Sequence, residues 1–144
     1  MGDGFNSLKV LIVEDSKATV EMIRSFLASM GIRHVTVASS GRDAIEMFTV
    51  SRPDIVLLDA ILPDLDGFEI ARQIRAHEKE GEWSAIIFLT SQTSDEHLAQ
   101  GIESGGDDYL MKPVSQMVLS SKVRAMQRLV QMQRSLVSVT HQLT

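Results

Sequence analysis

Short apolar runs alternate along the chain with longer stretches in which apolar residues recur every three or four positions. The runs span residues 8–13, 34–38, 55–58, 85–89 and 109–111. Continuous apolar runs of this length are typical of strands buried on both faces of a sheet. The stretches between them, at about 16–30, 40–52, 67–79 and 93–104 and from 114 onward, have the spacing of amphipathic helices. The pattern therefore predicts five strands, each followed by a helix.

Residues that begin and end helices lie at the edges of these stretches. Asp15 is expected to cap the first helix, and Gly31 is expected to end it. Thr93 and Glu96 have the spacing of a capping box at the start of the fourth helix. Pro113 is expected at the first position of the last helix, where its missing N–H has no cost.

The alternation of strands and helices predicts an α/β fold with a parallel sheet and right-handed crossovers. For five strands we expect a doubly wound, flavodoxin-like sheet in the order 2-1-3-4-5, with helices on both faces. The 144 residues contain no internal repeat and are expected to form one domain over residues 8–130. Residues 1–7 are expected to be a flexible N-terminus, and residues 131–144 to extend the last helix as a stalk or linker.

The composition excludes several classes of function. The formal net charge of −5 argues against a general nucleic-acid-binding surface, so no direct nucleic-acid partner is expected. The absence of cysteine excludes disulfides and thiolate metal sites. No stretch has the apolar length of a membrane span, and the N-terminus lacks the apolar core of a signal peptide. These features predict a cytoplasmic protein without membrane contact.

Polar side chains follow four of the five predicted strands at the point where each strand ends. Glu14 and Asp15 follow the first strand and Asp59 follows the third. Thr90 follows the fourth strand and Lys112 the fifth. In the order 2-1-3-4-5 these four strands are neighbours, so the side chains converge on the edge where open α/β sheets bind ligands.

Three carboxylates brought together in this way predict a metal site. They repel one another and raise one another's pKa values unless a cation joins them. Oxygen ligands without His or Cys favour Mg²⁺, which is usually held by a few carboxylates, waters and phosphate oxygens. No pair of histidines has ligand spacing, and all four are expected to be solvated: His34, His77, His97 and His141.

Such a site suits the transfer of a phosphoryl group to a carboxylate. Asp59 is the preferred nucleophile because it stands alone at the end of the central strand. Mg²⁺ would neutralise the developing charge, and Lys112 and Thr90 would hold the transferred group. We expect Asn at position 59 to abolish the reaction.

Four motifs carry a resemblance to a known family. They are Glu14-Asp15, Asp59 followed by Leu62-Pro63-Asp64-Leu65-Asp66-Gly67, Thr90-Ser91, and Gly105-Gly106-Asp107-Asp108-Tyr109-Leu110-Met111-Lys112-Pro113. In this order and spacing they resemble the receiver domain of bacterial two-component response regulators, over about residues 8–130.

The resemblance implies a role for each site residue. Asp59 would accept a phosphoryl group from a sensor histidine kinase or a phosphotransfer protein. Asp15, Asp59 and the main-chain carbonyl of Ile61 would bind Mg²⁺ directly, and Glu14 would bind it through water. Lys112 would be the phosphate partner, and Thr90 would form a switch pair with a tyrosine, which is Tyr109.

The resemblance also implies a phosphoprotein that relays a signal and does not turn over substrate. The chain would catalyse only its own Mg²⁺-dependent phosphorylation and dephosphorylation. Phosphorylation would switch the surface made by the fourth helix, the fifth strand and the last helix. Three residues depart from the commonest family pattern: Glu14 stands where Asp is frequent, Ile61 lies two residues after Asp59, and Gln92 lies two residues after Thr90.

Other readings of the same residues remain. A receiver that keeps the fold without the reaction is one. A dehalogenase-like phosphatase would need a second Asp two residues after the nucleophile, where Ile61 stands, so it would lack its general acid. A flavodoxin-type cofactor binder would need a phosphate cradle after the first strand, where Glu14 and Asp15 would repel an anion.

The last predicted helix carries two apolar stripes. One has the spacing to pack on the sheet: Leu119, Val123, Met126 and Val130. The other alternates steps of four and three residues, as in a coiled coil: Ala125, Leu129, Met132, Leu136, Val139 and Leu143. We expect a homodimer that uses this stripe together with the switch surface, and an output domain in a longer parent, such as a diguanylate cyclase. The alternative is a frayed tail, because Lys122, Arg124, Arg128 and Arg134 would repel one another between parallel copies.

Overall fold

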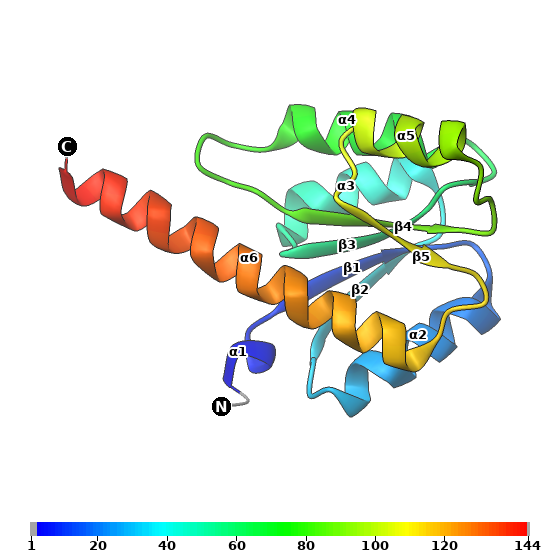
Figure 1. Ribbon diagram of the computed structural model, residues 1–144, viewed down its shortest axis with the longest axis horizontal. Helices are drawn as coiled ribbons and strands as arrows, with labels where there is room; N and C mark the ends of the chain where they lie inside the picture. The colour runs from blue at the N-terminus through cyan, green and yellow to red at the C-terminus, as the bar shows by residue number, and fades with distance from the viewer. Residues whose placement is uncertain (1–2, 144) are drawn as a thin grey trace.

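Five parallel strands form one open sheet in the order β2-β1-β3-β4-β5, in a computed structural model that describes residues 3–143 (Figure 1). The strands are β1 (Lys9–Val13), β2 (His34–Ala38), β3 (Ile55–Asp59), β4 (Ala85–Thr90) and β5 (Asp108–Met111). All four neighbouring pairs are parallel. The predicted fold class and strand order are confirmed.

Helices cover both faces of the sheet (Figure 1). One face carries α2 (Lys17–Ser29) and α6 (Gln116–Leu143), and the other carries α3 (Gly41–Ser51), α4 (Gly67–His77) and α5 (Asp95–Glu103). Among residues 3–143, no helix combines the length and the apolar character needed to cross a membrane.

Each face of the sheet has its own apolar core. On β3, Ile55 and Leu57 pack toward α2 and α6, whereas Val56 and Leu58 pack toward α3 and α4. All four side chains are 0% exposed. Since successive strand residues point to opposite faces, a strand covered on both sides must be apolar at every position. This is why the central strands read as unbroken apolar runs.

Two helix caps lie one residue beyond the predicted ones. Ser16, and not Asp15, caps α2, because its backbone is extended and its hydroxyl accepts the N–H of the third residue on. Ser94, and not Thr93, caps α5 in the same way. Adjacent residues with similar capping propensity cannot be separated by sequence, because the backbone conformation decides between them. Gly31 ends α2 as predicted, with a φ of +88°.

The N-terminal segment and the start of the last helix have features that the sequence did not predict. Residues 3–6, which lie within the segment expected to be flexible, form the short helix α1 (Asp3–Asn6). Phe5 packs against the core between the sheet and the pair α2 and α6. The Lys112–Pro113 peptide bond is cis and lies in the loop, and α6 begins at Gln116 and not at Pro113.

The last helix is held along most of its length. The predicted inner stripe packs on the sheet, and its side chains are at most 6% exposed: Leu119, Val123, Met126 and Val130. Beyond that stripe, Gln133 Nε2 donates to the carbonyl of Gly81 at 2.7 Å. Arg134 forms an ion pair with the buried carboxylate of Asp54. The first turns of the extension are therefore tied to the amino ends of the strands.

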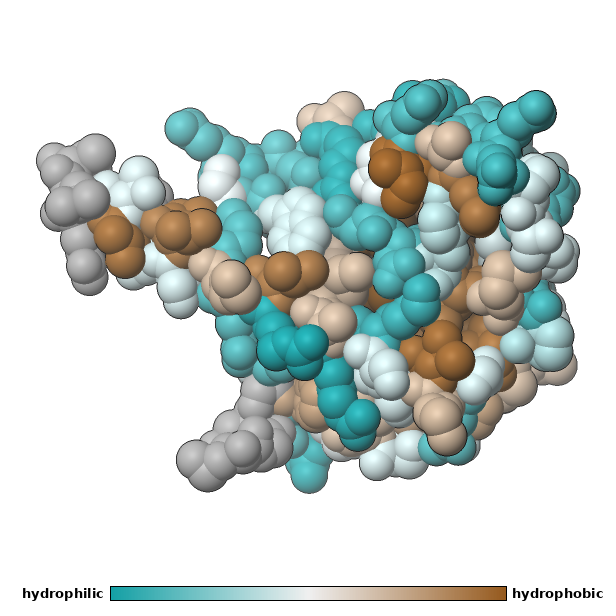
Figure 2. Space-filling model, in the orientation of Figure 1, coloured by the Kyte–Doolittle hydropathy of each residue, from teal (hydrophilic) through white to brown (hydrophobic). Residues whose placement is uncertain are grey.

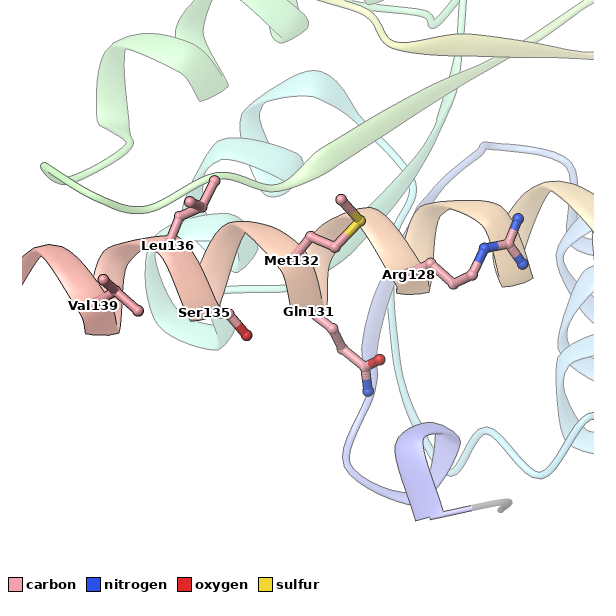
Figure 3. Close-up of a pocket in the computed structure, with 6 residues that line it drawn as sticks. All are labelled: Arg128, Gln131, Met132, Ser135, Leu136 and Val139. Carbon is pink, nitrogen blue, oxygen red and sulfur yellow. The ribbon is translucent and has the colours of Figure 1, made fainter.

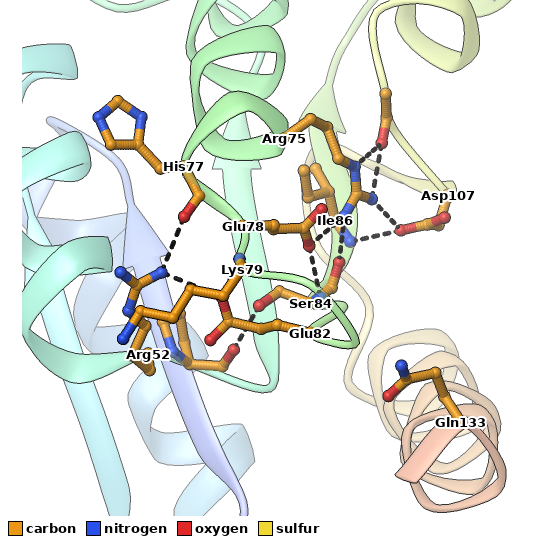
Figure 4. A network of polar contacts seen from close by, with 12 residues as sticks. Arg52, Arg75, His77, Glu78, Lys79, Glu82, Ser84, Ile86, Asp107 and Gln133 are labelled. Carbon is orange, nitrogen blue, oxygen red and sulfur yellow. Dashed lines mark hydrogen bonds and ion pairs between the residues drawn. The ribbon is translucent and has the colours of Figure 1, made fainter. Parts of the chain in front are cut away.

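Arg75 joins three elements at the end of the sheet opposite the strand carboxyl ends (Figure 4). Its guanidinium donates to the carbonyl of Gly105 and to Asp107 Oδ2, before β5. It also donates to Glu78 Oε2 after α4 and to the carbonyl of Ser84 before β4. Only a planar group with several fixed donors can reach all of these acceptors at once.

Replacing Arg75 with Lys should therefore destabilise the domain. A lysine has the charge but cannot donate in these directions together, and we expect a loss of about 2 kcal/mol in the free energy of unfolding, measured with urea. Arg72→Lys is the matched control, because Arg72 is on the same helix, is half-exposed and pairs only with Glu69 among the described residues. It should change stability by less than about 0.5 kcal/mol. Equal effects of the two substitutions would contradict this account.

Candidate functional site

The predicted site residues gather at the carboxyl ends of four neighbouring strands. Glu14 and Asp15 follow β1, and Asp59 is the last residue of β3. Thr90 is the last residue of β4, and Lys112 follows β5. The carboxylates of Glu14, Asp15 and Asp59 each place an oxygen within 4.8 Å of the others. The convergence expected from the strand order is therefore present.

One lysine bridges two buried acids at the centre of the site. Lys112 Nζ lies 2.7 Å from Glu14 Oε1 and 3.1 Å from Asp59 Oδ2. Glu14 is 1% exposed and Asp59 is 6% exposed, whereas Asp15 is open to solvent. Burial by itself lowers the pKa of Lys112, but the hydrogen bonds and charges of the two acids outweigh it and raise the pKa above its ordinary value.

Glu14 is the acid most affected by this environment. Burial raises its pKa from 4.5 to about 7; the neighbouring Asp59 adds to the shift, and Lys112 opposes it. Glu14 Oε2 accepts the N–H groups of Asp15 at 3.0 Å and Ser16 at 3.4 Å. The other oxygen, Oε1, is buried and accepts no well-formed hydrogen bond from the described residues, although Lys112 is close.

These features fit a divalent cation of the size and hardness of Mg²⁺. The donor set consists of carboxylate oxygens alone, and one of them, Glu14 Oε1, is buried with only the ammonium of Lys112 beside it among the described residues. Three acids face the single ammonium of Lys112, so the cluster carries an excess of negative charge when all are ionised. The carbonyl of Ile61 as a further ligand stays a prediction.

The loop after β3 is held in shape by Gly67 and Asp64. Asp59 Oδ1 accepts the N–H of Ile61 at 3.1 Å, and Gly67 donates its N–H to the carbonyl of Ala60 at 2.9 Å. A Cβ at position 67 would lie 2.3 Å from the carbonyl oxygen of Asp59, so only glycine allows the start of α4 to rest on this backbone. Asp64 accepts N–H groups from the first turn of α3, and these hold its pKa below the ordinary value. The loop is thus fixed at both ends.

The predicted switch residues lie in different environments. Thr90 is 3% exposed, and its Oγ1 accepts the N–H of Gln92 at 3.0 Å. The ring of Tyr109 stacks on Phe88 at 6.5 Å between centroids. Its hydroxyl is buried without a well-formed hydrogen bond to any described residue, and burial raises its pKa, with the Ile102 carbonyl acting in the opposite direction.

One histidine belongs to this site, and its expected solvated position is wrong. His97 Nε2 lies 3.1 Å from Thr90 Oγ1, and its ring lies 5.0 Å from that of Phe68. The sequence did hold a signal for it. His97 lies four residues before Gly101, which places both on the face of α5 that meets the sheet.

Comparison with known proteins gives a consistent family. A family model described as the response regulator receiver domain matches residues 10–124. The transcriptional regulatory protein AfsQ1 of Streptomyces coelicolor is 39% identical over 119 residues, which are 83% of this chain and 51% of AfsQ1. The chain thus spans about half the length of the curated relatives it matches.

Two solved structures are similar over most of the chain. One is the receiver domain of the sensor histidine kinase PA1611 from Pseudomonas aeruginosa, with a magnesium ion coordinated in its active-site cleft. Its TM-score is 0.73 at 33% identity, over 85% of this chain and 97% of that one. The other is the receiver domain of Ssk1 from Saccharomyces cerevisiae, solved with the histidine phosphotransfer protein Ypd1. Its TM-score is 0.74 at 32% identity, over 82% of this chain and 87% of that one.

The raised pKa of Glu14 makes stability depend on pH when no divalent cation is present. Between pH 4.5 and about 7 the folded chain keeps a proton that the unfolded chain has released. The free energy of unfolding should therefore fall as the pH rises through this window, by at most about 3 kcal/mol. Glu14→Gln should flatten the dependence, whereas Glu21→Gln, on the exposed side of α2, should leave it unchanged. Urea unfolding at a series of pH values measures this, and identical curves for wild type and Glu14→Gln would contradict it.

Proposed function

The chain belongs to the family of response regulator receiver domains, and on that premise we propose that it relays a signal by taking a phosphoryl group on Asp59. The observation that carries this proposal is the bridge from Lys112 to Glu14 and Asp59, in a cluster of three acids at the strand ends. An aspartate oxygen is thereby held beside a cation and beside oxygens suited to Mg²⁺. In this proposal the chain receives a phosphoryl group and does not turn over substrate.

The chain's own residues can carry the transfer. An oxygen of Asp59 attacks the phosphorus of a phosphohistidine, the P–N bond breaks, and its electron pair stays with the imidazole nitrogen. Lys112 changes partner from the carboxylate to the phosphoryl oxygens, and the hydroxyl of Thr90 donates to one of them. Asp15, Asp59 and the carbonyl of Ile61 would hold Mg²⁺, with Glu14 acting through water, and the ion would supply charge neutralisation at those oxygens.

We propose a histidine kinase or a phosphotransfer protein as the donor. The similarity to the Ssk1 receiver, which was solved with Ypd1, supports a donor of this chemistry. The similarity to the PA1611 receiver supports Mg²⁺ as the cofactor. Autocatalytic loss of the phosphoryl group and a cytoplasmic location stay predictions.

The output surface would be α5, β5 and α6, together with the outer stripe of α6. Leu129, Met132, Leu136 and Val139 are 45–68% exposed. In Figure 2 apolar side chains follow one another along the protruding part of α6. Met132, Leu136 and Val139 form an open apolar face on this helix, with Arg128, Gln131 and Ser135 beside them (Figure 3). The side chain of Leu143 lies outside those described.

We propose a second copy of the chain as the occupant of this stripe. Its four-three spacing is that of a coiled coil. The repulsion expected between parallel copies is reduced, because Lys122 pairs with Asp108 and Arg134 pairs with Asp54. Since relatives such as AfsQ1 are about twice as long, the same helix could lead into an output domain in a longer parent.

Asp59 should be the only residue phosphorylated by a small donor. Incubation with acetyl phosphate and Mg²⁺ should add one phosphoryl group, labile to hydroxylamine and detected by intact-protein mass spectrometry. Asp59→Asn should abolish the labelling completely. Asp43→Asn, at an exposed position of α3, should be labelled to the same extent as wild type. Undiminished labelling of Asp59→Asn would refute the assignment.

Phosphorylation should tighten a dimer that uses the outer stripe of α6. Sedimentation with and without beryllofluoride, a mimic of the phosphoryl group, should show tighter self-association of the loaded chain. Leu136→Glu, or removal of residues 131–144, should weaken it by on the order of tenfold, because a charge cannot be buried in an apolar seam. Ser138→Glu, on another face of the helix, should have little effect. A chain that stays monomeric under every condition would contradict the proposed dimer and leave residues 131–144 as a tail without this role.

A further inference from the structure

The hydroxyl of Thr90 is buried and already has partners in the unphosphorylated chain. Its oxygen accepts the N–H of Gln92 at 3.0 Å. Its hydrogen needs an acceptor, because the residue is 3% exposed. Among the described residues two acceptors are near: the carbonyl of Gln92 at 3.5 Å and His97 Nε2 at 3.1 Å. The carbonyl lies beyond the usual range for an O–H···O bond, so the imidazole nitrogen is the better acceptor.

A threonine hydroxyl has only one proton to donate. In the proposed function, this proton must point to a phosphoryl oxygen once Asp59 is loaded, since those oxygens are acceptors only. It cannot point to His97 Nε2 at the same time. The two arrangements of Thr90 therefore exclude each other.

The position of His97 on α5 means that the hydrogen bond between Thr90 and His97 joins β4 to α5. Its backbone N–H is held by the cap residue Ser94 at 3.2 Å, and its ring rests against Phe68. One turn later Gly101 brings the helix against the sheet, where an added Cβ would lie 3.2 Å from the ring of Phe88 and 3.3 Å from that of Phe68. The imidazole thus reaches Thr90 from a helix turn whose position is set by tight packing.

We infer that His97 is a positioning residue of the switch: its Nε2 accepts the hydroxyl proton of Thr90 in the unphosphorylated chain and competes for it with the phosphoryl group on Asp59. This inference rests on the proposed function and deepens it. Loading Asp59 draws the hydroxyl away and removes the polar tie between β4 and the first turn of α5. The strength of that tie sets how readily the chain takes the loaded arrangement.

Whether His97 opposes or favours phosphorylation of Asp59 depends on which atom donates the hydrogen bond between His97 and Thr90. If Nε2–H instead donated to Thr90, the hydroxyl would keep its own proton for the phosphoryl oxygen, and His97 would favour the loaded state. Nitrogen-15 spectra of the histidine rings in the free chain distinguish the two arrangements. We expect the unprotonated form of Nε2 in His97, and a change at this nitrogen when beryllofluoride and Mg²⁺ are added. A protonated Nε2 in the free neutral ring would overturn the inference.

Variants test the competition directly. His97→Phe keeps a ring beside Phe68 but removes the acceptor, and it should bind beryllofluoride about three- to tenfold more tightly than wild type. His97→Gln places an amide oxygen near the position of Nε2 and should return the affinity toward that of wild type. His34→Phe, at the exposed start of β2, is the matched control and should not change it.

The outcomes separate this inference from the function on which it rests. Equal or weaker binding of beryllofluoride by His97→Phe, with wild-type stability in urea, would overturn the inference and leave the function of Asp59 intact. A wild-type chain that binds no beryllofluoride, while His97 Nε2 is unprotonated in the free chain, would support the resting bond and overturn the proposed function.

Discussion

The pairing of Lys112 with two buried carboxylates is the interaction on which the site depends. Glu14, Asp59 and Lys112 lie at the carboxyl ends of three different strands, and the contacts at 2.7 Å and 3.1 Å hold those ends together. An uncompensated carboxylate at such depth is strongly destabilising, so the lysine makes the cluster tolerable. Lys112 does not make the cluster electrically neutral, because one ammonium faces three acids. The remaining negative charge would favour a cation at this edge of the sheet.

The two ends of the domain differ in how fully their polar groups are satisfied. Arg75 donates five hydrogen bonds at the amino end of β4, and this corner has one well-defined arrangement. At the other end, Glu14 Oε1 and the hydroxyl of Tyr109 are buried without well-formed hydrogen bonds. A ligand at this edge would complete their hydrogen bonding, whereas the acceptors around Arg75 are already satisfied.

Periodicity and strand-end chemistry were enough to predict the sheet, its order and the convergence of Glu14, Asp15, Asp59, Thr90 and Lys112. Both rest on strong constraints: a strand covered on both faces must be apolar at every position, and the carboxyl ends of parallel strands meet at one edge of the sheet. The caps at Ser16 and Ser94 were missed by one residue, because adjacent polar residues compete and backbone angles decide. His97 was missed because its role comes from a contact between a helix and the neighbouring strand. Its four-residue spacing to Gly101 indicates the inner face of α5, but that spacing does not specify the contact with Thr90 on the neighbouring strand.

The ion pair between Arg134 and Asp54 anchors the last helix at one point, and the helix extends beyond that point. Beyond Arg134 the helix continues to Leu143, which is about 14 Å at 1.5 Å per residue. Turning this segment by about 10° at Arg134 would move its end by roughly 2 Å. Asp54 also accepts the N–H of Lys9 at the start of β1, so this anchoring point is joined to the centre of the sheet. A rearrangement at the carboxyl edge that tilts the body of α6 would therefore move the far end of the helix more than the part beside Asp54.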